Sequence, residues 1–188
     1  MNNVVYGADD WDGNDDLSAT VMFGWDDYNL YIAAKVIDDE YVQNATGKDL
    51  FKGDSIEVLI DTKVANDFYL QTLSLDDYQL GVSPGTPKPG INPEAYLWYP
   101  PDEEGVQGNV KAGVALTENG YRIEVAIPWS TFEIAPLKGS HYGFAFSVSD
   151  NDKSDENIQQ SMVSTSPGRR LTDPTTWGDL ALMGQYKP

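Results

Sequence analysis

The chain has 188 residues, a length that suits one folded domain spanning residues 1–188. Its hydrophobic content of 40%, with 12% aromatic residues, is sufficient to fill a core and argues against a disordered chain. Its 12 basic and 30 acidic residues give a net charge of −18, which argues against nucleic acid or an anionic membrane as partner and suits a neutral ligand, a cationic partner or calcium. The absence of cysteine excludes disulfides, thiolate catalysis and zinc–thiolate sites.

Short segments of strand-like pattern, separated by turn-forming residues, fill the first half of the chain. They predict strands at residues 17–24, 29–38, 55–61, 67–75 and 77–83. In the third strand Ile56 and Val58 share one face, and Glu57 lies on the other. A carboxylate in the middle of a strand can be solvated, can belong to a site, or can pair with a cation such as Arg122. The residues alone leave these three readings open.

The second half of the chain opens with residues 83–108, which are rich in proline and predict a long loop within the domain. Strands follow at residues 109–117, 120–127, 142–150, 161–166 and 177–183, with a helical turn expected at 128–134. About ten short strands of this spacing predict an all-β fold: an antiparallel β-sandwich of jelly-roll or immunoglobulin-like two-sheet architecture.

The chain carries no recognisable catalytic motif. Its one histidine, His141, has no serine or cysteine beside it in a nucleophile context, and nucleophile-elbow, zinc-protease and phosphate-loop patterns are absent. The many acidic residues supply carboxylate pairs, but no spacing singles out a general acid and a general base. We therefore expect a non-catalytic domain.

Acidic residues gather at a few turns, and calcium prefers carboxylate and carbonyl oxygens as ligands. The clusters are Asp26-Asp27, Asp38-Asp39-Glu40 and the segment from Asp150 to Asp155. The last has oxygen-bearing residues at alternating positions but lacks the glycine and glutamate of an EF-hand. We expect a structural calcium ion, with the following ligands: Asp38, Asp39, Glu40, Asp150 and Asp152. Plain solvated turns are the alternative.

Among the aromatic residues in predicted loop or turn segments are Phe51, Tyr96, Trp98 and Tyr99. An exposed ring can stack on the apolar face of a pyranose, and it can equally plug the end of a sandwich. The residues alone favour neither reading.

Five segments, taken in order, resemble the family 9 carbohydrate-binding modules. They are GWDDYNLYIAAKVIDDEYV, FKGDSIEVLIDT, GYRIEVAIPWSTF, YGFAFSVSDND and RRLTDPTTWGDLAL. The resemblance extends from Trp11 to Leu182 and implies a sugar-binding β-sandwich with structural calcium. It also implies a non-catalytic module, covalently linked to neighbouring domains of an extracellular or cell-surface protein such as a xylanase. The best-studied members bind chain ends of glucan and xylan between two tryptophans.

The resemblance also implies a ligand site. Glu57 falls where the family has a glutamate that bonds sugar hydroxyls, and Gln79 matches a ligand-binding glutamine. Strand parity independently puts Gln79 on one face with Gly81, so two polar side chains on neighbouring strands could form a floor. Hydrogen bonds from hydroxyls to a carboxylate are charge-assisted and contribute about 1.5–3 kcal/mol each.

Three positions depart from the family pattern. Phe51 replaces the first of the two tryptophans, Leu171 aligns with the second, and Gly81 stands where the family has a binding arginine. Trp98, from the proline-rich segment, is the predicted replacement wall. The neighbouring Arg169 and Arg170 lie near the rim and could replace the missing cation.

The sequence therefore predicts non-catalytic binding of an oligo- or polysaccharide, with no nucleic acid and no membrane as partner. The predicted ligand-binding residues are Phe51, Glu57, Gln79, Trp98, Arg170 and Leu171. One alternative is a structural or adhesion domain of the same fold whose sugar site has decayed. Another is a haem-binding relative, which would need His141 with Met162 or Met22 as iron ligands.

Overall fold

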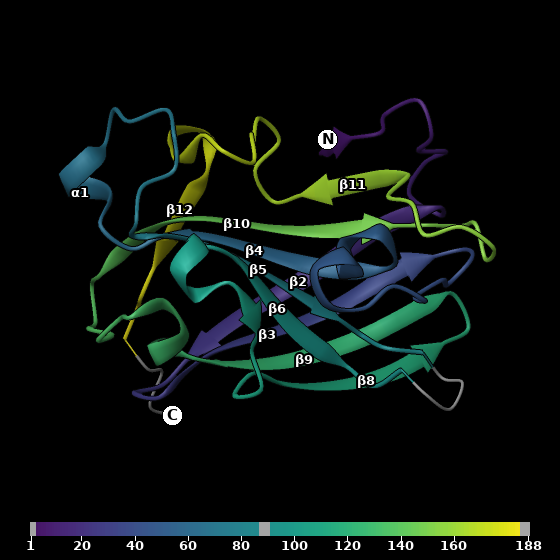
Figure 1. The fold of residues 1–188 in the computed structure, drawn as a ribbon, viewed down its shortest axis with the longest axis horizontal. Helices are drawn as coiled ribbons and strands as arrows, with labels where there is room; N and C mark the ends of the chain where they lie inside the picture. Colours follow the sequence, from purple (N-terminus) through teal and green to yellow (C-terminus); the bar gives the residue numbers. More distant parts are fainter. Residues whose placement is uncertain (1–2, 87–90, 185–188) are drawn as a thin grey trace.

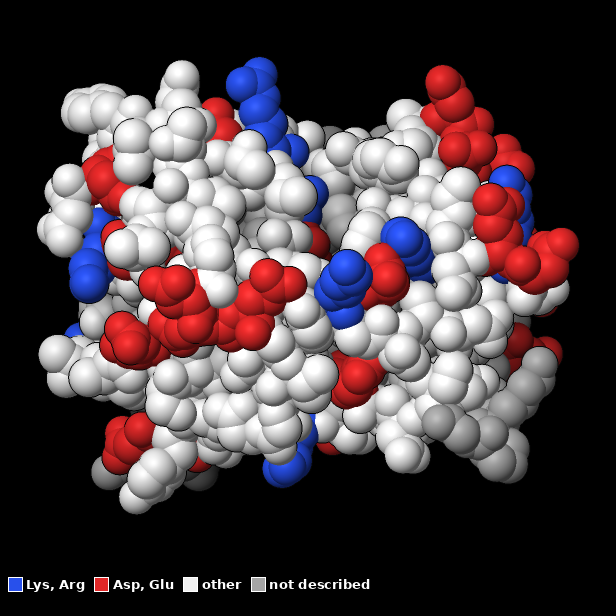
Figure 2. All heavy atoms as spheres, in the orientation of Figure 1, with Lys and Arg blue, Asp and Glu red and all other residues white. Residues whose placement is uncertain are grey.

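Two packed antiparallel β-sheets make up the protein in a computed structural model that describes residues 3–86 and 91–184 (Figure 1). Over these residues the larger sheet has eight strands in the order β1-β11-β10-β4-β5-β6-β7, with β12 paired to β10, and the smaller sheet has the order β2-β3-β9-β8. The predicted β-sandwich is confirmed. Acidic side chains gather at several places on the face of the molecule that Figure 2 shows. No helix within the described ranges is both long and apolar enough to cross a membrane.

The strands vary from two to ten residues in length. Those of the larger sheet are β1 (Val4–Tyr6), β4 (Ser55–Asp61), β5 (Asp77–Ser83), β6 (Glu94–Tyr99), β7 (Gly105–Val106), β10 (His141–Asp150), β11 (Ser161–Ser164) and β12 (Gly178–Ala181). Those of the smaller sheet are β2 (Leu17–Trp25), β3 (Asn29–Asp38), β8 (Lys111–Thr117) and β9 (Gly120–Pro128). The helical segments are α1 (Val64–Asp67) and the 3-10 turns η1 (Gly47–Lys52), η2 (Pro101–Glu103), η3 (Trp129–Phe132) and η4 (Pro174–Thr176).

The core lies between the sheets because alternate residues of each strand point inward. On β4 the inward side chains are Ile56, Val58 and Ile60, each at most 1% exposed. They meet the inward residues of β3 and β9, and the turn after β9 adds the buried rings of Trp129 and Phe132. The predicted parity of β4 is therefore confirmed, and Glu57 points away from the core.

Register explains how the outer face of the larger sheet brings polar residues together. Glu57 lies directly opposite Gly81 of β5 and Ser147 of β10, and Gln79 lies opposite Leu59. Glu57 and Gln79 are thus diagonal neighbours on one face, a relation that long side chains can bridge. The segment between β11 and β12 and the loop that carries α1 both lie along the upper edge of Figure 1, beyond β10 and β4.

Two segments differ from the sequence-based prediction. Residues 67–75 were expected to form a strand, but Asp67 ends the single turn of α1 and residues 68–75 form an irregular loop, in which Leu70 N–H bonds to the carbonyl of Asp67. Phe68 is 61% and Tyr69 88% exposed, so these two rings cover no core. Of the apolar residues in this segment, Leu73 packs against Leu59 and Trp177, whereas Phe68 and Tyr69 remain exposed.

The proline-rich segment is the second difference. Residues 83–108, expected to be one loop, contain β6 and the short β7, which extend the larger sheet beyond β5. The prolines flank β6 and do not interrupt it, so its backbone N–H groups remain available for the sheet. Residues 87–90, in the middle of the same segment, lie outside the described residues.

Candidate functional site

A hollow of about 510 Å³ opens on the outer face of the larger sheet, above β4 and β5. Glu57 and Gln79 line it from the two strands, and Phe51 and Trp98 line it from η1 and β6. The segment that follows β11 contributes the rest of the predicted set, together with one residue outside that set: Arg169, Arg170 and Leu171. The structure therefore brings all six predicted ligand residues to one hollow.

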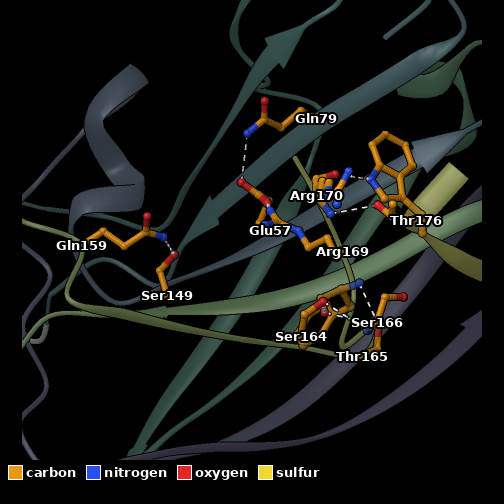
Figure 3. A network of polar contacts seen from close by, with 12 residues as sticks. Glu57, Gln79, Ser149, Gln159, Ser164, Thr165, Ser166, Arg169, Arg170 and Thr176 are labelled. Carbon is orange, nitrogen blue, oxygen red and sulfur yellow. Dashed lines mark hydrogen bonds and ion pairs between the residues drawn. The ribbon is translucent and has the colours of Figure 1, made fainter. Parts of the chain in front are cut away.

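Glu57 is held from two sides at the floor of this hollow. The amide of Gln79 donates a hydrogen bond from Nε2 to Glu57 Oε2 at 3.0 Å, and the guanidinium of Arg169 forms an ion pair with Oε1 (Figure 3). The side chains of Glu57 and Arg169 are each only 7% exposed. The partner of Glu57 is thus Arg169, whereas Arg122 lies on β9 in the other sheet, opposite Lys35.

Arg169 brings a charge into the hollow that the sheet itself does not supply. Burial lowers the pKa of its guanidinium to about 10, which leaves it charged at neutral pH. Its buried Nε has no hydrogen-bond partner among the described residues, which leaves this donor unsatisfied within the protein. Arg169 occupies the role for which Arg170 was predicted, while Arg170 lies at the rim with a side chain 76% exposed.

Trp98 forms a wall of the hollow, and Gly81 makes room for it. A Cβ atom at Gly81 would come 2.3 Å from Cη2 of Trp98, so any side chain there would displace the indole. The indole Nε1 donates to the Lys48 carbonyl at 2.8 Å, and its ring meets Phe51 edge to face at 6.0 Å. Trp98 therefore lines the hollow from strand β6, and not from a loop as the sequence predicted.

The rim segment after Arg169 is braced by hydrogen bonds. Arg170 N–H donates to Thr176 Oγ1 at 2.8 Å (Figure 3). Trp177 Nε1 donates to the Arg170 carbonyl at 2.9 Å. Trp177 itself is buried against Leu59. These contacts hold Arg170 and the 41% exposed Leu171 at the mouth of the hollow.

Sequence reasoning missed several lining residues. Gln159 lines the hollow from the irregular segment before β11, and its Nε2 donates to Ser149 Oγ at 2.7 Å. Tyr6 and Met162 line it from β1 and β11. Strand periodicity could not place Gln159, because its segment has no regular structure, and β1 was too short to predict.

A separate group of buried carboxylates lies where β3 and β10 end. Carboxylate oxygens of Asp38, Asp150 and Asp152 lie within 4.8 Å of one another, and an oxygen of each is buried without a hydrogen-bond partner among the described residues. Burial is the main cause that raises the pKa of Asp38 to about 7 and of Asp150 to about 8, and the charge of Asp152 raises both further. Mutual repulsion without a nearby cation fits a bound metal ion.

The five predicted calcium ligands are not all alike in position. Asp39 joins Asp16 and Asp152 in an adjoining group within the same 4.8 Å limit, although Asp16 was not predicted. Glu40 is exposed and belongs to neither group of the described residues, and only its backbone N–H bonds to Asp38 Oδ1, at 3.0 Å. A further group, which the sequence did not reveal, consists of Asp61, Asp67 and Asp76.

Two further predictions from the sequence concern the acidic turn at Asp26 and a haem site at His141. Asp26 caps its own turn, since Oδ1 accepts the N–H groups of Tyr28 and Asn29 at 2.8 Å each. His141 pairs with Asp179 at the start of β10, whereas Met162 lies beside Ser149, eight residues along the same strand. At about 3.3 Å per residue the two are about 26 Å apart, too far to ligate one haem.

The arrangement at Glu57 can recognise a polyhydroxylated ligand. Its floor offers carboxylate and amide oxygens as acceptors and amide and guanidinium groups as donors, which match hydroxyls that both donate and accept. Aromatic walls beside such polar groups suit the apolar face of a pyranose. Fold and site together define a ligand-binding β-sandwich.

Comparisons with known proteins agree with this definition. The family model described as carbohydrate family 9 binding domain-like matches residues 2–185. Exoglucanase XynX of Acetivibrio thermocellus is 29% identical over 92% of this chain and 14% of its own length. Endo-1,4-beta-xylanase A of Thermoanaerobacterium saccharolyticum is 28% identical over 92% of this chain and 13% of its own length. The chain thus spans only a small part of these relatives.

Solved structures resemble the fold as well. A family 9 carbohydrate-binding module from Caldicellulosiruptor kristjanssonii in complex with cellotriose has a TM-score of 0.68 at 20% identity, covering 98% of this chain and 83% of its own. The module from the same organism in complex with glucose has a TM-score of 0.69 at 20% identity, covering 94% and 82%. The chain belongs to the family 9 carbohydrate-binding domains. It is a non-catalytic carbohydrate-binding module and not an enzyme.

Proposed function

We propose that the Glu57 hollow is the saccharide site of this module and that it binds neutral chains of glucose or xylose units. The hydroxyls of one sugar ring form hydrogen bonds with Glu57, Gln79 and Arg169. The apolar face of the ring packs against Trp98 and Phe51. Two observations support this choice of sugars. The similar solved structures are complexes with cellotriose and glucose, and the relatives similar in sequence are named as an exoglucanase and a xylanase.

One observation carries the proposal: a carboxylate buried under an aromatic-lined hollow, already held by an amide and a guanidinium. Burying an ion pair contributes little to stability, because desolvation offsets the attraction. A preformed set of donors and acceptors facing a hollow does, however, spare a ligand the cost of ordering them. The arrangement therefore suits binding better than folding.

The test begins with a glycan array, followed by calorimetric titration of the best ligand. Glu57→Gln keeps the shape but removes the charge, so affinity should fall about tenfold or more. Glu124→Gln is the matched control, since Glu124 is an exposed strand carboxylate on the other sheet. Thermal melts must show that both variants are folded at the titration temperature. Unchanged affinity in Glu57→Gln would remove Glu57 from the site, and no binding to any glycan would favour the structural or adhesion alternative.

We further propose that the module is covalently linked to a catalytic or surface domain in an extracellular protein and holds that domain on polysaccharide. Support comes from the relatives, in which the matching part is a small share of a long enzyme. Fusing the module to an unrelated reporter should make the reporter co-sediment with insoluble cellulose or xylan, and Glu57→Gln should release it.

We also propose calcium as a structural ion, with Asp38, Asp150 and Asp152 as the principal ligands and Asp39 beside them. The unpartnered buried oxygens and the upward pKa shifts of Asp38 and Asp150 support this proposal. Glu40 points to solvent and is left out of the ligand set. Bound calcium would neutralise the repulsion between these carboxylates and fix the ends of β3 and β10.

A further inference from the structure

A second hollow, of about 590 Å³, opens on the same outer face of the larger sheet. Its floor is formed by Asp61 and Gly143, which lie opposite each other on β4 and β10. The loop that carries α1 lines one part of it, and the residues around η4 and the start of β12 line another. In Figure 1 these two segments lie next to each other at the upper left.

Two exposed aromatic side chains and one buried aromatic side chain line this hollow. Tyr69 is 88% and Phe68 61% exposed, and their rings meet edge to face at 5.0 Å, whereas Trp177 is 8% exposed and packed on the sheet. Contiguous exposed rings on a soluble protein mark a binding surface more often than chance exposure does. The same residues were expected to form a strand, and no core contact accounts for them.

The second hollow shares a strand carboxylate and an amide with the first hollow but has no guanidinium among its described lining residues. Asp61 is a carboxylate on β4 and only 5% exposed, and Gln71 and Thr175 add an amide and a hydroxyl to the lining. The carboxylates of Asp67 and Asp179 also line it, and the lining residues include no lysine or arginine. Carboxylates without a cation repel an anionic ligand and accept hydrogen bonds from hydroxyls, so the chemistry fits a neutral polyol.

The two hollows lie in line on one strand. Glu57 and Asp61 point to the same face of β4 and are four residues, or about 13 Å, apart. The braced segment between β11 and β12 lines both: Arg169 and Arg170 face the first hollow, and Thr175 and Trp177 face the second. A short oligosaccharide can span this distance over the outer face.

We propose that the hollow formed by Asp61, Phe68, Tyr69 and Gln71 is a second saccharide subsite, which binds a further unit of the neutral chain held at Glu57. The Tyr69 and Phe68 rings pack against a pyranose, and Asp61 and Gln71 bond its hydroxyls. Two linked contacts on one chain raise affinity through effective concentration, so the module favours long chains over short ones. The inference rests on the proposed function in that the same chain occupies both hollows.

The experiment uses calorimetry to compare the affinities of the wild type and of single-residue variants for short and long oligosaccharides. Cellotriose and cellohexaose are titrated, with xylotriose and xylohexaose in parallel. Tyr69→Ala should weaken binding of the six-unit ligands about tenfold and leave the three-unit ligands unchanged. Glu57→Gln should weaken both lengths. Tyr28→Ala, which removes a 77% exposed tyrosine from the turn between β2 and β3, should change neither.

Each outcome decides between the two sites. Equal affinity of wild type and Tyr69→Ala for the six-unit ligands would overturn the second subsite and leave the Glu57 site standing. If Glu57→Gln changes no affinity while Tyr69→Ala weakens all, the proposed function at Glu57 fails and the second hollow is the saccharide site. Gln71→Ala provides a second variant that removes no aromatic ring, and it should weaken only the six-unit ligands. Because Tyr69 covers no core, a folding defect is not expected, and a thermal melt checks this.

Discussion

Two groups of buried carboxylates in this module differ in what neutralises them. Glu57 is paired with the guanidinium of Arg169 and with the amide of Gln79. Asp38 and Asp150 face Asp152 instead, and oxygens of all three have no hydrogen-bond partner among the described residues. The first group is close to neutral as a unit, whereas the second holds protons when no cation is bound, as the raised pKa values of Asp38 and Asp150 indicate.

The difference indicates which ligand each group can accept. A compensated carboxylate offers hydrogen bonds without a net charge, which suits the hydroxyls of a sugar. Carboxylates that raise one another's pKa gain most from a cation, because the ion removes both their repulsion and their desolvation. The arginine beside Glu57 thus distinguishes the proposed sugar floor from the proposed metal site at Asp38, Asp150 and Asp152.

The largest expected effect comes from removing that arginine. Arg169→Gln leaves Glu57 buried without a cation, and we expect the free energy of unfolding to fall by about 3–5 kcal/mol. Urea unfolding measures this loss. Arg170→Gln, at the exposed neighbour, should stay within about 0.5 kcal/mol of wild type.

The double variant Glu57→Gln, Arg169→Gln sharpens the same prediction. It removes both charges, so most of the lost stability should return, although sugar binding should not. If the single and the double variant are equally stable, the ion pair is not what neutralises Glu57.

Calcium should produce the next largest effect, at the other group. At a hundredfold excess over its dissociation constant, calcium should raise the free energy of unfolding by about 2.7 kcal/mol. Asp150→Asn should reduce this response, while Asp27→Asn, at an exposed turn residue, should not. Identical melts of the wild type in calcium and in excess chelator would contradict the metal site.

The pH dependence of the chelated protein should have the opposite sign to that of most paired carboxylates. The pKa of Asp38 is raised to about 7 and that of Asp150 to about 8, chiefly by burial, so the folded protein retains protons that the unfolded chain releases. Stability should therefore fall as pH rises from about 4 towards 8, by up to about 1.4 kcal/mol per pH unit for each carboxyl. Melts across this range measure the slope, which calcium should flatten. A chelated protein that gains stability with rising pH would refute the assignment.

The smallest effect concerns the wall of the sugar site. Gly81→Ala places a Cβ 2.3 Å from the indole of Trp98, so the ring must move into the hollow or away from it. We expect sugar affinity to fall several-fold, and stability to fall by about 1–3 kcal/mol because the Cβ also comes 2.8 Å from Cδ1 of the buried Leu50. Gly113→Ala on β8 is the matched control, since its Cβ would meet no atom within 4 Å. Equal affinities in the two variants would show that the position of Trp98 does not matter.

Much of this architecture could be predicted from the sequence because alternation on β3, β4 and β5 is regular, and parity alone put Glu57 and Gln79 on one face. The pairing of Glu57 with Arg169 could not be predicted, because Arg169 reaches the floor from an irregular segment more than a hundred residues away. Trp98 was assigned to a loop because flanking prolines outweighed the strand pattern of β6. Phe68 and Tyr69 contributed to an apolar pattern that predicted a strand, although both side chains are exposed on the surface.

Nuclear magnetic resonance of the labelled protein tests the central claim most directly, that Glu57, Gln79 and Arg169 together form the sugar floor. The best array ligand is titrated while the side-chain resonances of Gln79 Nε2 and Arg169 Nε are followed. Both should shift and saturate with the dissociation constant that calorimetry gives, while Trp129 Nε1, bonded to the Asp26 carbonyl at 2.9 Å within the core, should not move. Saturable binding that shifts other resonances and leaves Gln79 and Arg169 unchanged would contradict the account.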